Sequence, residues 1–313
     1  MTNLSEFTFL SSDGKTQLHG MLWEPEGVAV RAVLQICHGV AEHIARYDGF
    51  ARALNEQGIV VAGHDHLGHG KSLPEGGTPV YFGQGSTWNT VVDDIYILHQ
   101  RLKQRYPDAP LCIMGHSMGS FLTRTYLIRY PGTVKAAVIM GTGWQPRAAI
   151  TGGLALANAI AAVSGENATS ELVTELAFGS YNKLFAPNRT KVDWLSADES
   201  NVDDYIADPL CGADATVGLF RQMLHGIRFN QRQSHLRQMD REMPVLFVAG
   251  DKDPVGSCGK GVRQTYDAFR AAGMRDCTLK LYPGLRHEIL NEKAYTADIT
   301  KNIEAWLLSR LEK

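Results

Sequence analysis

One serine in the sequence stands in a setting that suits nucleophilic attack. An apolar run at 111–114 leads into Gly115-His116-Ser117-Met118-Gly119-Ser120, and residues 121–130 then have helical spacing. In the pattern strand, Gly-x-Ser-x-Gly, helix, the serine occupies a sharp turn that exposes its hydroxyl, and the two glycines let neighbouring backbone approach. A phosphate-cradling loop is disfavoured because the Gly-Lys pair of a P-loop is missing. The pattern predicts Ser117 as a nucleophile.

A serine hydroxyl needs a base to take its proton and an acid to orient that base. After the apolar run 245–249 comes Gly250-Asp251-Lys252-Asp253-Pro254, and after the run 278–282 comes Gly284-Leu285-Arg286-His287-Glu288. His287 is therefore the predicted base. The acid is either Asp251 or Asp253. We expect Asp253, because Asp251 directly follows Gly250 and can hold the turn.

Two backbone N–H groups are expected to stabilise an oxyanion, the negative charge that develops on the attacked carbonyl. One belongs to Met118, the residue after the nucleophile. The other is assigned to Val40, in the loop that follows the apolar run 32–37. The adjacent Gly39 lets this loop fold close to the serine.

The elements that must position these groups alternate short apolar runs with helical segments, which is typical of a mostly parallel sheet covered on both faces. We expect residues 7–10 and 18–23 to form an antiparallel hairpin at the sheet edge. The parallel strands should then lie at 32–37, 59–62, 111–114, 136–140, 245–249 and 278–282. The last helix should bury one apolar stripe, made of Tyr295, Ile299, Ile303, Trp306, Leu307 and Leu311. Ser117, Asp253 and His287 all follow strand ends, where active groups of such sheets gather.

The interval 144–241 breaks this alternation, because it shows helical segments and no convincing strand. We interpret it as a helical cap inserted into a core domain of residues 1–143 and 242–313. A separate helical domain is the alternative, but the strand pattern resumes at Pro244, which favours an insertion. Nine apolar cap residues could line an acyl-chain channel or could simply pack the cap: Leu154, Leu156, Ile160, Val163, Leu172, Leu176, Phe178, Leu184 and Phe185.

Composition excludes several classes of protein function. A net charge of −2 with 44% hydrophobic residues disfavours both nucleic-acid binding and disorder. The five cysteines share no CxxC spacing, which argues against a disulfide framework and a zinc ribbon. The beginning of the sequence shows no secretory signal. The cysteine pattern favours a reducing compartment, so we expect a cytoplasmic protein. The apolar stretch 148–163 is short and interrupted by polar residues, so any membrane contact is expected to be peripheral.

The loop 63–72 carries three histidines and an aspartate: His64, Asp65, His66 and His69. Zinc is disfavoured there, because no further nearby Cys or His completes a tetrahedral set. We expect a hydrogen-bonded loop that braces the site.

Five motifs together resemble one family: HGVAEHIARY, GHDHLGHGKS, GHSMGS, GDKDPV and GLRHE. They are similar to the monoacylglycerol lipase and lysophospholipase branch of the α/β-hydrolases, which is also grouped with serine aminopeptidase-like hydrolases. The resemblance covers nearly the whole chain outside the cap. It implies an α/β-hydrolase fold and the same five residues in the same roles, with Ser117, Asp253 and His287 as the triad and Val40 and Met118 as oxyanion donors.

The resemblance further implies that Glu42 and Arg46 lie near the polar end of the pocket, where the alcohol part of a monoacylglycerol would sit. The expected reaction is hydrolysis of a lipid ester through an acyl-enzyme, with no metal and no organic cofactor. Amidase or aminopeptidase, C–C hydrolase and thioesterase activities remain open on the same triad. A catalytically silent ligand receptor is a further alternative, which the intact triad disfavours.

Overall fold

A single eight-stranded sheet organises the chain in the computed structural model, which describes residues 1–311 apart from the side chains of Leu176 and Ala177. The strand order is β1-β2-β4-β3-β5-β6-β7-β8. β1 and β2 form an antiparallel hairpin, β2 pairs antiparallel with β4, and all other pairs are parallel. The α/β fold expected from the sequence is therefore confirmed.

The strands occupy the expected positions and most extend beyond them. Their bounds are β1 Thr2–Leu10, β2 Gln17–Pro25, β3 Ala32–Cys37, β4 Ile59–His64, β5 Leu111–His116, β6 Ala136–Met140, β7 Val245–Gly250 and β8 Cys277–Tyr282. β5 runs two residues past its apolar run, through Gly115 and His116, because both residues stay paired with β6. Hydrophobicity alone could not show this extension, which carries the strand right up to Ser117.

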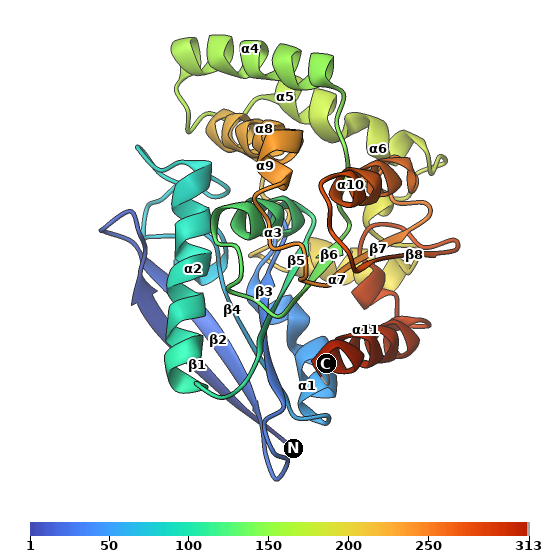
Figure 1. The fold of residues 1–313 in the computed structure, drawn as a ribbon. Helices are drawn as coiled ribbons and strands as arrows, with labels where there is room; N and C mark the ends of the chain where they lie inside the picture. Colours follow the sequence, from blue (N-terminus) through green and yellow to red (C-terminus); the bar gives the residue numbers. More distant parts are fainter. Residues whose placement is uncertain (312–313) are drawn as a thin grey trace.

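Helices cover both faces of the sheet, as Figure 1 shows. α1 (Asp48–Asn55) and α11 (Thr296–Leu311) pack on one face, and α2 (Trp88–Arg105), α3 (Met118–Arg129) and α10 (Lys260–Ala271) pack on the other. Every residue of β3 through β7 is buried, as expected for strands covered on both sides.

The last helix, α11, buries a narrower stripe than the sequence predicted. Ile299, Ile303 and Leu307 are fully buried, whereas Tyr295 is 51% exposed. Tyr295 lies one residue before the helix begins, so its ring does not follow the helical spacing.

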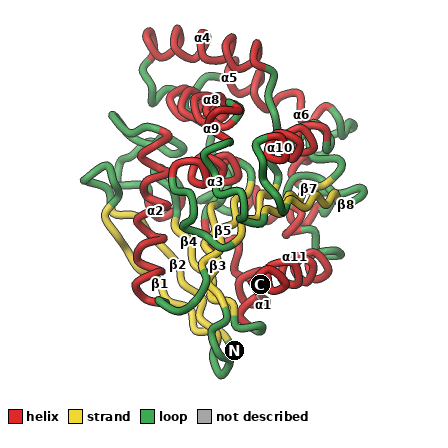
Figure 2. Tube along the Cα trace, in the orientation of Figure 1, coloured by secondary structure: helices red, strands yellow, loops and turns green. Residues whose placement is uncertain are grey.

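Between β6 and β7 the described residues form helices and one isolated bridge, Thr169 to Thr216. The α-helices are α4 (Arg147–Ser164), α5 (Glu171–Thr174), α6 (Ser180–Lys183), α7 (Glu199–Ala207), α8 (Val217–Asn230) and α9 (Gln233–Leu236). Figure 2 shows this helical layer above the sheet. α8 packs on α3 of the core, and α4 lies on α8, farthest from the sheet. We keep the predicted boundaries 144–241 as the definition of the cap.

Candidate active site

Ser117 lies on a strained turn between β5 and α3. Its backbone angles are φ 54° and ψ −122°, a left-handed conformation that a serine rarely adopts. The flanking glycines have the predicted steric role. A Cβ on Gly115 would lie 2.2 Å from the carbonyl oxygen of Gly119, and a Cβ on Gly119 would lie 2.0 Å from that of Cys37.

His287 and Asp253 are hydrogen-bonded, although 34 positions separate them in the sequence. The Asp253 Oδ1 to His287 Nδ1 distance is 3.0 Å, and the same Oδ1 accepts from the Val255 N–H at 2.9 Å. Asp253 is fully buried and His287 nearly so. The His287 Nε2 has no hydrogen-bond partner among the described residues, and His287 lines the same cavity as Ser117. The arrangement leaves that nitrogen free to exchange a proton with a group in the cavity.

Asp251, the alternative acid, makes a different hydrogen bond. Its Oδ1 accepts a hydrogen bond from the Gly284 N–H at 2.8 Å. This bond joins the loop after β7 to the loop after β8, three residues before His287. The structure therefore gives Asp251 the turn-holding contact and gives Asp253 the contact with the histidine.

The two expected oxyanion donors belong to segments that both adjoin Ser117. Val40 lines the cavity, and the neighbouring Gly39 is so close that a Cβ there would lie 3.0 Å from the Ser117 Cβ. Met118 is the first residue of α3, where a backbone N–H has no acceptor inside the helix.

Glu42 and Arg46 belong to a buried network that sequence reasoning saw only in part. Glu42 accepts hydrogen bonds from the Gly39 N–H at 2.5 Å, the Tyr47 hydroxyl at 3.1 Å and Arg46 at 3.0 Å. Arg46 also donates two hydrogen bonds to the carboxylate of Glu288, at 2.7 and 2.8 Å. Glu42 lines the cavity, whereas Arg46 is not among its lining residues.

Glu288 and His116 also belong to this network, and the sequence did not lead us to predict a role for either residue. His116 contacts Glu42 through Nδ1 at 3.1 Å and the carbonyl of His287 through Nε2 at 3.3 Å. Glu288 accepts from Asn201 of α7 at 2.8 Å, which ties the cap to the histidine loop. Adjacency was the available signal, since His116 precedes the serine and Glu288 follows the histidine.

The network fixes the charges beside the cavity. Burial raises the pKa of Glu42, but the hydrogen bond from His116 and the charges of His116 and Arg46 outweigh burial and hold this pKa below its ordinary value. Burial lowers the pKa of His116, but Glu42 outweighs it and raises the pKa. Burial likewise opposes ionisation of Glu288, and the charge of Arg46 still lowers its pKa.

The loop 63–72 braces the site as expected. Asp65 accepts hydrogen bonds from the backbone N–H groups of Ile44 at 2.8 Å and Lys71 at 2.9 Å, and its Oδ2 lies 3.0 Å from the His19 Nδ1. Burial opposes ionisation of Asp65, yet these hydrogen bonds lower its pKa to about 2. Asp65 thus ties the loop that follows β4 to the loop that carries Val40.

The cavity in front of Ser117 has a volume of about 790 Å³. Its core wall includes Val40, Glu42 and His116, and its cap wall includes Phe178, Trp194 and Leu195. Such a volume is typical of a small-molecule site.

Most of the apolar cap residues proposed for a channel do not line this cavity. Phe178 does, while Leu154, Leu156 and Ile160 pack into the apolar core. Val163, Leu172 and Leu184 are exposed, and the side chain of Leu176 lies outside the described ones. Of the two alternatives left open by the sequence, packing applies to Leu154, Leu156 and Ile160 and channel lining to Phe178, because helical spacing shows which face is apolar but not what that face contacts.

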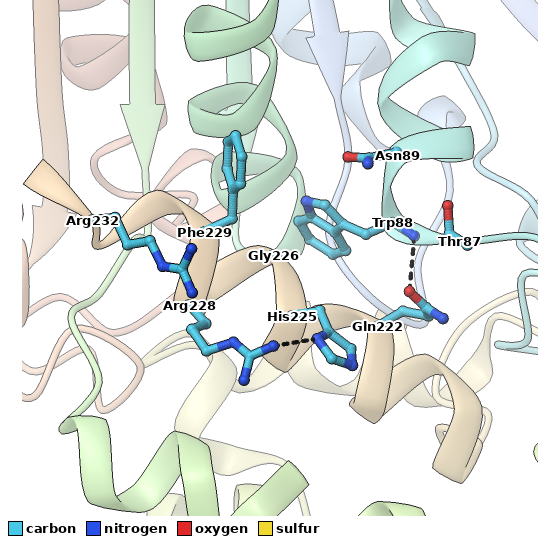
Figure 3. A pocket seen from close by; sticks show the side chains of 9 residues that line it. All are labelled: Thr87, Trp88, Asn89, Gln222, His225, Gly226, Arg228, Phe229 and Arg232. Carbon is cyan, nitrogen blue, oxygen red and sulfur yellow. Dashed lines mark hydrogen bonds between the residues drawn. The ribbon is translucent and has the colours of Figure 1, made fainter. Parts of the chain in front are cut away.

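A smaller pocket of about 240 Å³ lies where α8 of the cap meets the start of α2 (Figure 3). The backbone N–H of Trp88 donates to the Gln222 side-chain oxygen at 3.0 Å, and the Arg228 guanidinium lies 3.1 Å from the His225 Nδ1. None of the predicted site residues lines this pocket. It marks the junction between cap and core.

Comparisons with known proteins show which family this chain resembles. A family model described as serine aminopeptidase, S33, matches residues 28–294. The chain is 31% identical to a monoacylglycerol lipase of Mycolicibacterium smegmatis over 98% of both chains. It is 28% identical to a monoglyceride lipase of Homo sapiens, over 96% of this chain and 89% of that one.

A solved structure shows the same fold. A thermostable carboxyl esterase from Bacillus coagulans, in complex with glycerol, is 26% identical and superposes with a TM-score of 0.92 over 99% of this chain and 100% of the esterase. The family model spans most of the chain, and the first of these relatives matches along nearly its whole length. The chain therefore belongs to the serine aminopeptidase S33 family of α/β-hydrolases.

Proposed function

We propose that this chain hydrolyses carboxylic esters of lipids, with monoacylglycerols as the preferred substrates. One observation carries the proposal: a serine on a strained strand-to-helix turn shares a cavity with a histidine that an aspartate orients. The monoacylglycerol lipases among the relatives support the substrate class, because they match along nearly the whole chain.

The proposed reaction has two steps. His287 takes the proton of the Ser117 hydroxyl through Nε2 as the serine oxygen bonds to the ester carbonyl carbon. The N–H groups of Val40 and Met118 stabilise the oxyanion, and the glycerol oxygen leaves with the proton from His287. In the second step His287 takes a proton from water, which attacks the acyl-enzyme. The fatty acid then leaves and the proton returns to Ser117.

Glu42 is proposed to mark the alcohol end of the substrate. It is held ionised beside the cavity by Arg46 and His116, and an ionised carboxylate can accept hydrogen bonds from glycerol hydroxyls. Arg46 is proposed to act through Glu42 and Glu288 and not by direct contact with the substrate.

We also propose that the cap makes peripheral contact with membranes through α4. By length and composition α4 is apolar enough to cross a membrane, with a mean hydropathy of 1.3, and only 17% of this stretch is buried. Because α4 packs on α8, an interfacial position suits it better than a spanning one. A cytoplasmic location is proposed as well, supported by five cysteines that are all free.

Substrate profiling tests the proposed function. Rates are measured for glycerol monoesters of several acyl lengths, a lysophospholipid, an acyl thioester and aminoacyl anilides, with Ser117→Ala as the background. Glycerol monoesters should have the highest kcat/KM. Faster hydrolysis of aminoacyl anilides would replace the proposal by an aminopeptidase, and no Ser117-dependent turnover of the glycerol monoesters or the lysophospholipid would reject a lipid ester hydrolase.

A further inference from the structure

Three side chains of different donor types meet where the cap touches the loop after β3. They are His43 of that loop, Asp208 at the end of α7, and Cys211 three residues later. One nitrogen, one oxygen and one sulfur from these residues all lie within 4.8 Å of one another. From this geometry we propose that the three residues form a binding site for a zinc-type divalent cation, which fastens the cap to the core.

The donor set selects the class of ion. Imidazole nitrogen and thiolate sulfur suit zinc and similar transition metals, whereas calcium and magnesium prefer oxygen ligands. Three protein ligands leave a fourth tetrahedral position for water or another ligand. In binding, the Cys211 thiol gives its proton to solvent, and His43 binds through Nε2 with its own proton on Nδ1.

The three ligands are already held near one another. The Nε2 of His43 lies 2.8 Å from the Oδ2 of Asp208, while the other carboxylate oxygen accepts from the Leu210 N–H at 2.9 Å. The Cys211 N–H donates to the carbonyl of Asp208 at 3.0 Å. Since tetrahedral zinc sites keep their ligand atoms roughly 3 to 4 Å apart, small side-chain movements suffice to admit the ion.

The surrounding charge favours a cation. Arg46 is a nearby positive charge, and it is shared between the carboxylates of Glu42 and Glu288. Asp208 adds another negative charge, partly open to solvent with 28% of its side chain exposed. An ion can therefore enter from solvent on the Asp208 side and meet a negatively charged group of ligands.

The position explains what the ion would do. The Gly212 N–H and the Tyr205 hydroxyl both donate to the carbonyl of Ala41, each at 3.0 Å, so this part of the cap already rests on the loop of Val40. A metal ion joining His43 to Asp208 and Cys211 adds a link between the same two segments. The inference does not depend on the substrate, because it is measured by binding and stability.

Zinc titration against a chromophoric chelator tests the site, with Cys211→Ser and Asp208→Asn as ligand variants. Cys277→Ser is the matched control, since Cys277 is also a half-buried free cysteine but lies on β8. We expect one zinc per wild-type chain, the same affinity in Cys277→Ser, and at least about 100-fold weaker binding in both ligand variants.

Two spectroscopic and thermal readouts complete the test. Cobalt should give a thiolate-to-metal charge-transfer band in wild type and Cys277→Ser but not in Cys211→Ser. Zinc should raise the melting temperature of the same two proteins only, because it binds the folded state. Absence of stoichiometric binding to wild type would overturn the inference, and so would binding that Cys211→Ser retains.

Discussion

The core and the cap of this chain use their apolar side chains in opposite ways. In the core, strands β3 through β7 are buried at every residue between two layers of helices. In the cap, α4 has eighteen residues and buries only Ile150, Leu154 and Ala157. The core therefore surrounds the proposed reacting groups with buried strands, while α4 of the cap leaves apolar surface exposed, which is the surface proposed for membrane contact. Changes to the proposed reacting groups in the core should lower the rate on every ester, and changes to the exposed face of α4 should alter membrane binding and not the reaction on soluble esters.

The largest expected effect comes from the core residue Ser117. Replacement by alanine removes the proposed nucleophile and should lower kcat roughly 10⁴- to 10⁶-fold on all esters. The melting temperature should stay close to wild type, because only one oxygen is lost at a turn that α3 and β5 hold. Ester hydrolysis retained in this variant would place the chemistry elsewhere.

Asp253 and Asp251 form the next test, because both belong to the same core loop. Asp253→Asn should lower kcat about 10⁴-fold, since an amide at this position favours the wrong tautomer of His287. Asp251→Asn keeps an acceptor for the Gly284 N–H and should cost about 1 kcal/mol of stability at most. Steady-state kinetics and thermal melts of the two variants separate the roles, and a larger rate loss at Asp251 would reverse our assignment.

Acid should weaken the core through a group of buried histidines. Burial lowers the pKa of His64 to about 3 and that of His69 to about 4, and it holds the pKa of His66 well below its ordinary value. The unfolded chain binds protons at these rings below about pH 6.5, whereas the folded chain does not, so stability is lost as the pH falls through this range.

The expected loss at about pH 5 is roughly 2 kcal/mol for each such histidine. Melting curves at neutral and acidic pH measure it, and His64→Phe should lose less stability on acidification than wild type. An equal loss in both proteins would show that His64 does not contribute.

The smallest effect is expected in the cap. Val163 is 88% exposed on α4, and Val163→Asp should weaken binding to phospholipid vesicles roughly tenfold, since burying a valine is worth about 1.5 kcal/mol. Hydrolysis of a short soluble ester should not change. Leu10→Asp, at an exposed leucine of the core sheet edge, is the control that should keep vesicle binding. Equal losses in both variants would argue against a membrane face on α4.

The same contrast explains what the sequence could predict. The strands and the positions of Ser117, Asp253 and His287 followed from local signals, because a buried parallel strand is a continuous apolar run and these three residues follow the ends of such runs. The choice of Asp253 over Asp251 was also within reach, since a residue next to Gly250 suits a turn. Glu288 and His116 had adjacency as a signal, but nothing local shows that they meet through Glu42 and Arg46.

The sequence could not show which cap residues line the cavity, for a physical reason. Helical spacing identifies an apolar face but not its partner, and α4 and α8 differ in this respect, because α4 leaves most of its residues unburied while α8 packs on α3 of the core. Leu154 faces α8 and not the cavity, while Trp194, which the apolar pattern did not single out, lines the cavity with its ring centroid 5.1 Å from that of His287. The grouping of His43 with Asp208 and Cys211 joins residues more than 160 positions apart and needs the folded chain to be seen.

The central claim is that Ser117 is the nucleophile, activated by His287 and oriented by Asp253. It is tested most directly by reacting the folded protein with a fluorophosphonate and mapping the adduct by peptide mass spectrometry, with and without competing monoacylglycerol. The account predicts one adduct per chain on Ser117, slower labelling when monoacylglycerol is present, and much slower labelling in Asp253→Asn. An unlabelled folded protein, or an adduct on a different residue, would contradict it.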